Sequence, residues 1–332
     1  MKLSKIIIFL ISSVILIGIS ILVSLAFGAR YVDLSEVVNS LLHPENTSFN
    51  ALVVRERVPR TVFAIVAGAS LGVSGALMQA ITRNPIADPS ILGVNTGASL
   101  FVVSGIAFFN ISTAGQYIWL ALAGASLTAV FVYGIGSLGN GGATPIKLAL
   151  AGAATSAALS SLVSAVILPR TEVMNAFRFW QVGSVSGATW EGIATVIPFL
   201  GIGMVIAILL TPALNALALG DDVATGLGVR TGVVRMLGAF AGVLLCGATT
   251  ALTGPIGFVG LMIPHIMRLI CGPNMRYVVV MSTVGGAIIL TLSDTIGRLI
   301  GIPGELEAGI VTAFLGAPVL IFIAMRVKVR SL

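Results

Sequence analysis

Residues 61–82 read TVFAIVAGASLGVSGALMQAIT, and this uncharged stretch between Arg60 and Arg83 decides the class of fold. An α-helix needs about 20 residues to cross the hydrocarbon core of a bilayer, so the stretch predicts one crossing. Its many glycine, alanine and serine residues predict a helix that packs closely against other helices. A path lined by small, uncharged groups that lets a bulky solute pass is an alternative interpretation of the same composition.

Further uncharged runs extend this pattern over the whole chain. They cover residues 6–29, 89–146, 148–169, 192–220, 236–267, 277–293 and 308–325. The run 89–146 must cross twice, with a break around residues 110–115, and the run 236–267 is expected to cross twice, with a break at Gly254-Pro255. The sequence therefore predicts an all-α integral membrane protein, one transmembrane domain over residues 1–332 with about ten spans.

The composition excludes several other classes of protein. Of the 332 residues, 57% are hydrophobic and only 9% are charged, whereas soluble domains carry about 25% charged residues. An ordinary soluble enzyme and a disordered chain are both excluded. The net charge of +6 comes from basic residues scattered singly between apolar runs, so no nucleic-acid surface is indicated. Cys246 and Cys271 fall in or beside apolar runs and are expected to be ordinary buried thiols.

The distribution of basic residues favours an orientation with both termini in the cytoplasm. The first run follows Lys2 and Lys5 and is longer than the core of a signal peptide, about 7–15 residues, so we interpret it as a retained span. In this orientation most of the 18 Lys and Arg residues flank the inner ends of the spans, as the positive-inside rule requires. The basic residues on the outer flanks are Arg30, Arg55, Arg57, Arg60, Arg170, Arg178 and Arg298.

Two segments between spans have patterns of their own. Residues 171–191 are polar and aromatic and predict an interfacial helix on the outer side, with a plain outer loop as the alternative. Residues 213–235 form the longest inner connection, which contains Asp221 and Asp222 between glycines. There we expect two short helices on the inner face of the membrane, with Asp221 as a helix cap.

Ionisable side chains are nearly absent from the spans, and His265 and Asp294 are the only candidates. A transporter driven by an ion gradient usually keeps such groups in mid-membrane, so a self-sufficient secondary transporter is disfavoured. The phosphate-binding loop ending in Gly-Lys-Ser/Thr is also missing, so energy for uphill transport must come from a partner. An intramembrane enzyme built on His265 is a further alternative, but this histidine lacks the companions of a zinc or acid-base site and is expected to be structural.

Three motifs are more specific than the composition. They are Arg57-Val58-Pro59-Arg60 with residues 75–79 and 83–93, the segment 254–268, and Pro303-Gly304-Glu305-Leu306-Glu307 leading into Gly316-Ala317-Pro318. Together with residues 218–229 they resemble the FecCD family, the permease subunits of bacterial ATP-driven importers for iron-siderophores, haem and cobalamin. The resemblance runs over nearly the whole chain and implies a ten-span permease of the cytoplasmic membrane.

The resemblance also implies partners, a cargo and site residues. It implies a second, identical or different, permease subunit, two ATPase subunits that bind the ATP, an extracytoplasmic substrate-binding protein, and no cofactor on this chain. Residues 87–95 and 303–307 look more like the siderophore branch, so a ferric siderophore is the expected cargo, with haem and cobalamin as alternatives. The implied site residues are Arg57, Arg60 and Arg298 for docking of the binding protein, Gly220, Asp221, Asp222, Ala224, Gly226 and Gly228 for coupling to the ATPase, and Thr144, Pro145 and Ile146 for an inner gate.

The three arginines have other interpretations as well. A cation on an outer flank can anchor a lipid headgroup, and Asp294 with Arg298 has the i, i+4 spacing of an internal helical ion pair. Bidentate pairing with carboxylates on a partner protein is the role that the resemblance favours.

Overall fold

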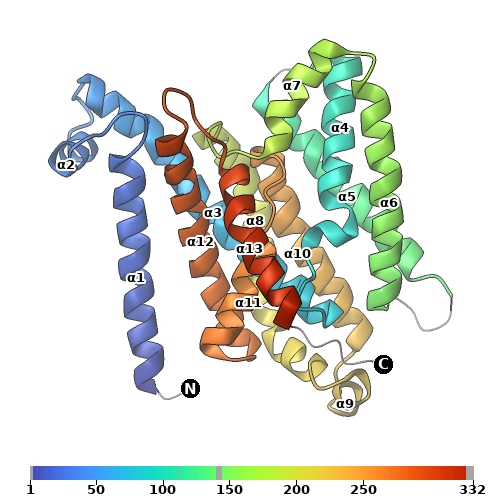
Figure 1. Cartoon of the computed structure of the whole chain (residues 1–332). Coiled ribbons are helices and arrows are strands. Elements are labelled where there is room, and N and C mark those ends of the chain that lie inside the picture. Colours follow the sequence, from blue (N-terminus) through green and yellow to red (C-terminus); the bar gives the residue numbers. More distant parts are fainter. Residues whose placement is uncertain (1–2, 112, 140–143, 327–332) are drawn as a thin grey trace.

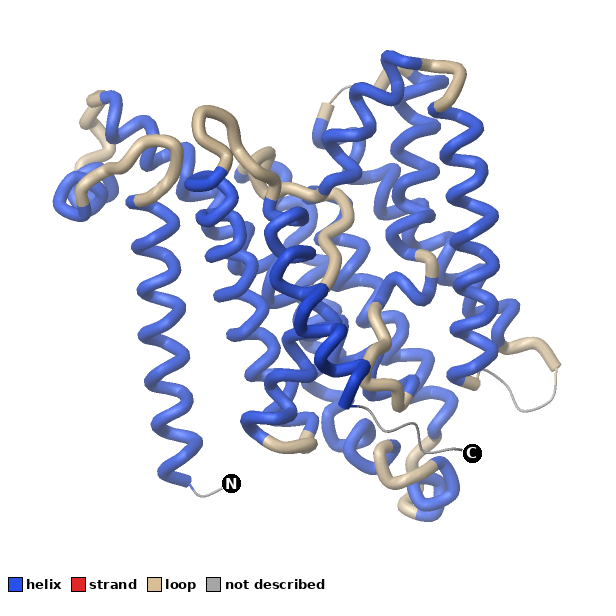
Figure 2. The backbone as a smooth tube through the Cα atoms, in the orientation of Figure 1, coloured by secondary structure: helices blue, strands red, loops and turns tan. Residues whose placement is uncertain are grey.

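The computed structural model describes residues 3–111, 113–139 and 144–326, and within these ranges the chain forms helices and loops without a strand (Figures 1 and 2). The all-α prediction is therefore confirmed. The helices are α1 (Leu3–Ala26), α2 (Leu34–Leu42), α3 (Phe49–Thr82), the 3₁₀ helix η1 (Pro89–Leu92), α4 (Val94–Phe109), α5 (Ala114–Gly136), α6 (Pro145–Ile167), α7 (Thr171–Val182), α8 (Trp190–Leu217), α9 (Asp221–Gly226), α10 (Thr231–Thr253), α11 (Val259–Cys271), α12 (Met275–Ile300) and α13 (Ala308–Arg326).

The described helices include 6 that are long and apolar enough to cross a membrane, namely α3, α5, α6, α8, α10 and α12. Shorter apolar stretches lie in α1, α4, α11 and α13. The predicted breaks are confirmed, because α4 ends before Asn110, whose φ of 50° is left-handed, and α10 ends before Gly254, whose φ is 71°. The chain is a multi-pass membrane protein, and the count of ten spans stays a prediction.

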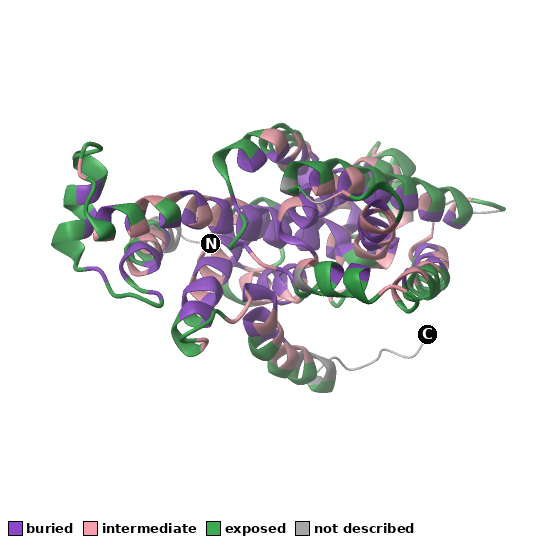
Figure 3. Ribbon diagram, turned by 90° about the horizontal axis from the view of Figure 1, so that it is seen from above, coloured by how far each residue is buried: buried purple, intermediate pink, exposed green. Residues whose placement is uncertain are grey.

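The two ends of the bundle carry different elements (Figure 1). One end holds α2, α7 and the loop 301–307, and we call it the outer end, following the predicted orientation. The opposite, inner end holds α9, the start of α1 and the end of α13 (Figure 1). Seen from above, exposed residues follow the rim and buried residues fill the middle (Figure 3).

The helix α3 is the spine of the molecule and packs against α12, α10 and α11. Its 34 residues span about 50 Å at 1.5 Å per residue, more than the roughly 30 Å of a hydrocarbon core. The helix therefore continues beyond the apolar layer, and its outer turns carry Arg55, Arg57 and Arg60. This single helix connects the two ends of the protein.

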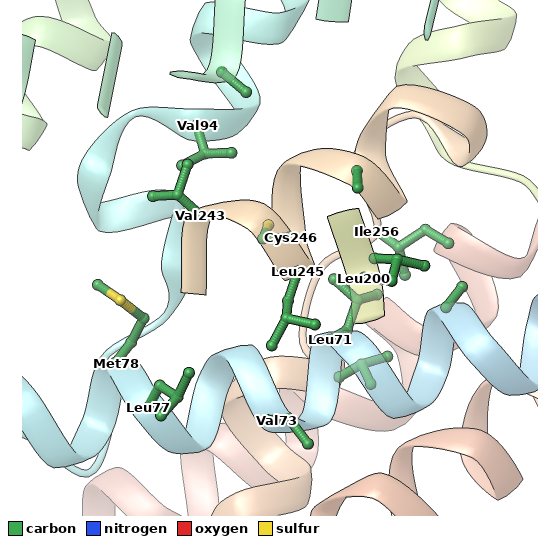
Figure 4. Packing of buried hydrophobic residues seen from close by; sticks show 14 of the residues in the cluster. Leu71, Val73, Leu77, Met78, Val94, Leu200, Val243, Leu245, Cys246 and Ile256 are labelled. Carbon is green, nitrogen blue, oxygen red and sulfur yellow. The ribbon is translucent and has the colours of Figure 1, made fainter. Parts of the chain in front are cut away.

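Small residues let α3 approach its neighbours at backbone distance. A Cβ placed on Gly68 would lie 2.1 Å from the carbonyl oxygen of Gly286 in α12, and one on Gly75 would lie 1.7 Å from that of Gly260 in α11. Close packing through small residues is thus confirmed for residues 67–75. Between these contacts, Leu71 and Leu77 of α3 join side chains of α4, α8 and α10 in one apolar core (Figure 4).

The connection between α3 and α4 turns back into the bundle. After Arg83, which has a left-handed φ of 51°, η1 packs against α6, α4, α5 and α10. A Cβ on Gly152 of α6 would lie 1.6 Å from the carbonyl oxygen of Ile91, so backbone touches backbone here as well. Because η1 occupies residues 89–92 and α4 begins only at Val94, α4 has 16 residues.

The inner connection differs from its prediction in one respect. Only one short helix, α9, forms between residues 213 and 235, because residues 213–217 complete the last turn of α8 beyond Pro212. On the outer side, α7 confirms a helix in the segment 171–191. It buries Val173 and Phe177 against the bundle, and the Phe177 ring stacks on Trp180 with 5.7 Å between the centroids.

Candidate functional site

A cluster of arginines and carboxylates lies at the outer end, where α1, α3 and α12 meet. Arg60 donates from Nε and Nη2 to both carboxylate oxygens of Asp294, at 2.7–3.1 Å, and from Nη1 to Oε2 of Glu305 at 2.7 Å. Asp294 is almost fully buried and also pairs with Arg298, with 3.2 Å between Nη2 and Oδ2. The internal Asp294–Arg298 pair that the helical spacing suggested is therefore confirmed.

Arg57 and Arg298 hold the outer end of α1. Arg57 donates to the carbonyl oxygens of Leu25, Ala26 and Arg30 at 2.6–3.2 Å. Arg298 donates to those of Ser24 and Phe27 at 3.1 and 3.2 Å. The last carbonyls of a helix have no partners within the helix and carry partial negative charge, so cations are stabilising there.

The three arginines differ in what they offer to a partner. Residue exposures are 8% for Arg57 and 2% for Arg298. Their hydrogen bonds and ion pairs run to α1, to the carbonyl oxygens of Phe27 and Arg30 just after it, to Thr295 and to Asp294. The side chain of Arg60 is 11% exposed and its pair with Glu305 reaches the surface. Their binding to a partner protein stays a prediction; within this chain, Arg57 and Arg298 already serve α1.

An open cleft of about 760 Å³ lies over this cluster. Cationic and anionic side chains both face it, so it suits a charged protein surface better than an apolar ligand. Its lining residues are Ala29, Arg30, Phe49, Leu52, Val53, Glu56, Arg57, Arg60, Ser186, Arg298 and Glu305.

At the inner end, Asp221 fixes the position of α9. Its carboxylate pairs with Arg83, which follows α3, and accepts from Nη2 of Arg235 in α10 at 2.9 and 3.0 Å. Arg235 also donates to the carbonyl oxygen of Ile81 at 3.3 Å. The prediction that Asp221 caps this helix is wrong, because Gly220, with a φ of 119°, is the N-cap residue. Asp221 instead forms ion pairs that tether α9 to the neighbouring helices.

The remaining residues of the predicted coupling segment form the helix and its ends. Ala224 lies on the buried side of α9 and is fully buried, whereas Asp222 is exposed. Gly226 ends the helix and Gly228, at a φ of 82°, donates to the carbonyl oxygen of Thr225 at 2.9 Å. Three apolar side chains stay exposed in and beside this short helix: Val223 of α9 at 50%, Leu219 before its N-cap at 64% and the C-cap residue Leu227 at 63%.

The predicted gate residues begin α6. Thr144 is the N-cap residue and accepts from the backbone N–H of Lys147 at 3.4 Å, and Pro145 occupies the first turn. Ile146 is 68% exposed. Most of the membrane-spanning part of α6 is not buried within this chain, and its residues Ser160, Ser161 and Ser164 are exposed.

The structure also brings together polar groups that the sequence did not single out. Asp88 caps η1 by accepting from the backbone N–H of Ser90 at 2.9 Å, and a Cβ on Gly260 would lie 3.3 Å from its Oδ2. The carboxylate therefore lies beside the first turn of α11, where free N–H groups favour negative charge. In the same interior, Thr250 donates to Oδ1 of Asn95 at 3.1 Å. Pro85, Asp88 and Pro89 are the available signal in the sequence, but the prolines indicate only a turn that ends the helix.

His265 and the two cysteines do not form a metal or catalytic cluster among the described residues. Cys246 and Cys271 are buried and free, as expected. In the parts of the chain that the structure describes, no group of three or more His, Cys, Asp and Glu side chains is placed to hold a metal ion, and this includes the surroundings of His265.

The bundle of apolar helices, an ionic cleft at one end and a tethered short helix at the other, defines a polytopic membrane permease. The comparison with known proteins gives its family. The FecCD transport family matches residues 15–326. The chain belongs to this family, as the sequence motifs implied.

The relatives cover almost the full chain. FepD, the ferric enterobactin transport system permease protein of Escherichia coli (strain K12), is 40% identical over 312 residues, which are 94% of this chain and 93% of FepD. YfmD, the Fe(3+)-citrate import system permease protein of Bacillus subtilis (strain 168), is 39% identical over 97% of this chain and 96% of its own. A solved structure described as an inward-facing metal-chelate type ABC transporter contains a chain 28% identical, with a TM-score of 0.82 over 96% of this chain and 98% of that one. The protein is a transport permease of the ABC-importer type.

Proposed function

We propose that this permease carries a ferric siderophore across the bacterial cytoplasmic membrane. The observation that supports this cargo is the similarity, over nearly the whole of both chains, to permeases named for ferric enterobactin and ferric citrate. Haem and cobalamin are the alternative cargoes of the same architecture. Both termini of the chain lie in the cytoplasm in this proposal, on the side of α9.

The energy comes from two ATPase subunits, one of which binds α9 of this chain while the other binds the second permease subunit. The exposed apolar side chains of Val223 in α9 and of Leu219 and Leu227 beside it would lie in an apolar groove of that ATPase. Asp221 links α9 by ion pairs to the inner end of α3 and to α10, so a movement of α9 is transmitted to two long helices. In this proposal the partner binds and hydrolyses the ATP, and this chain binds no cofactor.

The cargo arrives with a binding protein at the outer cleft. Arg60 is the docking cation that we place nearest to the partner, since its pair with Glu305 is the one that solvent reaches. Arg57 and Arg298 contribute by holding the outer end of α1, and they complete the positive charge of the cleft.

The translocation path follows α6 and is shared with a second permease subunit. The exposed serines and alanines of this apolar helix can line a path through which a polar cargo moves without tight binding. The same small residues allow a helix of the second subunit to approach closely. Thr144, Pro145 and Ile146 form the inner gate, with the exposed Ile146 as its apolar plug.

The test is reconstitution of the complex purified from its host in mild detergent. Mass spectrometry of the co-purified proteins identifies the ATPase, the second permease and the binding protein. Vesicles with ATP inside are then offered radiolabelled iron as catecholate, hydroxamate and citrate complexes, with haem and cobalamin in parallel. We expect ATP-dependent uptake of one ferric siderophore class. Uptake of haem or cobalamin alone would refute the cargo, and uptake by the lone permease without an ATPase would refute the importer class.

A further inference from the structure

Glu305 occupies the one donor of Arg60 that faces the outside. Nε and Nη2 of Arg60 are bound to Asp294, whose side chain is 1% exposed, and only Nη1 points to the surface. There it meets Oε2 of Glu305, whose side chain is 38% exposed. A group that approaches from outside reaches Glu305 before it reaches the guanidinium.

The loop that carries Glu305 is held at its base. The backbone N–H of Leu306 donates to the carbonyl oxygen of Gly297 at 3.1 Å, and a Cβ on Gly297 would lie 2.1 Å from the carbonyl oxygen of Leu306. Residues 301–304 form the turn that precedes Glu305, at the outer end of α12 (Figure 1), and the backbone N–H of Gly301 donates to the carbonyl oxygen of Gly297 at 3.0 Å. Backbone hydrogen bonds thus hold the loop on both sides of Glu305, so its partly exposed side chain can rotate away from Arg60 while α12 and α13 stay in place.

We propose that Glu305 is an internal competitor for the docking site, and that a carboxylate of the binding protein binds Arg60 by displacing it. This inference rests on the proposed docking of a binding protein at the outer cleft. One carboxylate replaces another, so the mostly buried guanidinium is never left with its outer donor unpaired, a state that would be costly. The exchange makes docking reversible and selects an acidic side chain at this position, because a neutral or basic one does not compensate the lost pair.

The first experiment needs no partner. The permease in vesicles is treated with phenylglyoxal, which modifies accessible arginines, and the peptide containing Arg60 is quantified by mass spectrometry. In Glu305→Gln and Glu305→Ala we expect Arg60 to be modified about fivefold faster, as loss of one partly exposed ion pair allows. Glu56→Gln is the matched control, since Glu56 is exposed in the same cleft and forms no ion pair among the described residues. Equal modification in all four proteins would overturn the inference.

The second experiment measures the affinity of the co-purified binding protein for the reconstituted complex. Glu305→Gln should bind about fivefold tighter than wild type, and Glu56→Gln should not. Arg60→Lys, which keeps a cation opposite Asp294, should bind more weakly. If Arg60→Lys weakens binding but Glu305→Gln leaves it unchanged, the competition is refuted and docking at Arg60 stands. If Arg60→Lys and wild type bind equally, docking at Arg60 itself is wrong.

Discussion

Replacing Gly75 by alanine tests whether α3 and α11 need backbone contact. The added Cβ would lie 1.7 Å from the carbonyl oxygen of Gly260, 2.4 Å from its carbonyl carbon and 2.6 Å from its Cα. Ordinary contact begins at 3.4 Å, so the helices must separate by about 1.7 Å. All three obstacles are backbone atoms, which cannot rotate away as a side chain can. We therefore expect a loss near the upper end of the overpacking range, about 3 kcal/mol.

The assay is thermal unfolding in detergent, followed by the loss of the monodisperse peak in size-exclusion chromatography. A loss of about 3 kcal/mol corresponds to a fall in Tm of roughly 5 °C for a chain of this size. The matched control is Gly201→Ala in α8, where the new Cβ meets nothing within 4 Å and alanine favours the helix. Equal Tm values for the two variants would show that α3 and α11 do not pack at this distance.

Three further substitutions examine the two ends of the bundle and the packing of η1 against α6. Arg298→Met breaks the buried ion pair with Asp294 and removes the donor to the carbonyl oxygen of Ser24 in α1, at a cost of about 3–5 kcal/mol. Trypsin should therefore cleave after Arg30 faster in this variant than in the control Arg230→Met. Equal cleavage in the two variants would contradict the anchoring of α1 by Arg298. Asp221→Asn removes the tether of α9, so the assembled complex should keep ATP hydrolysis but lose transport about fivefold; Asp222→Asn removes the same charge without loss of a tether and should transport nearly normally. Gly152→Ala should displace α6 from η1 and reduce transport about tenfold in vesicles, while Gly134→Ala, with free space around its Cβ, should not.

The sequence predicted the helices well, because uncharged runs and their proline and glycine breaks are local signals. The breaks after α4 and after α10 begin at Asn110 and Gly254, whose positive φ ends each helix. The path of residues 84–93 could not be predicted in the same way. Proline in an uncharged run indicates that a helix ends. Whether the chain then stays at the surface or returns into the bundle depends on close contacts such as that of Gly152 with the backbone of Ile91, and Gly152 is far from Pro85 in the sequence.

The sequence indicated which residues belong to the candidate site but not most of the partners that they bind. Motifs indicated Arg57, Arg60 and Arg298, and the i, i+4 rule indicated the pair of Arg298 with Asp294. The acceptors of Arg57 are backbone carbonyls of α1, and a carbonyl leaves no mark in the sequence. The same limit applies to Asp221, whose partners Arg83 and Arg235 are brought to it by the packing of α3 and α10 and not by spacing.

The continuity of α3 gives these two ends a common mechanical element. Arg60 lies in its outer part and Arg83 caps its inner end, so the same 34-residue helix carries the proposed docking cation and ends at a partner of Asp221, the proposed coupling residue. Backbone contacts with α11 and α12 along residues 68–75 prevent α3 from bending freely between them. Under the proposed docking and coupling, we expect a displacement at the outer cleft to reach Asp221 as a tilt or shift of α3 as one body, without a chain of side-chain rearrangements through the membrane.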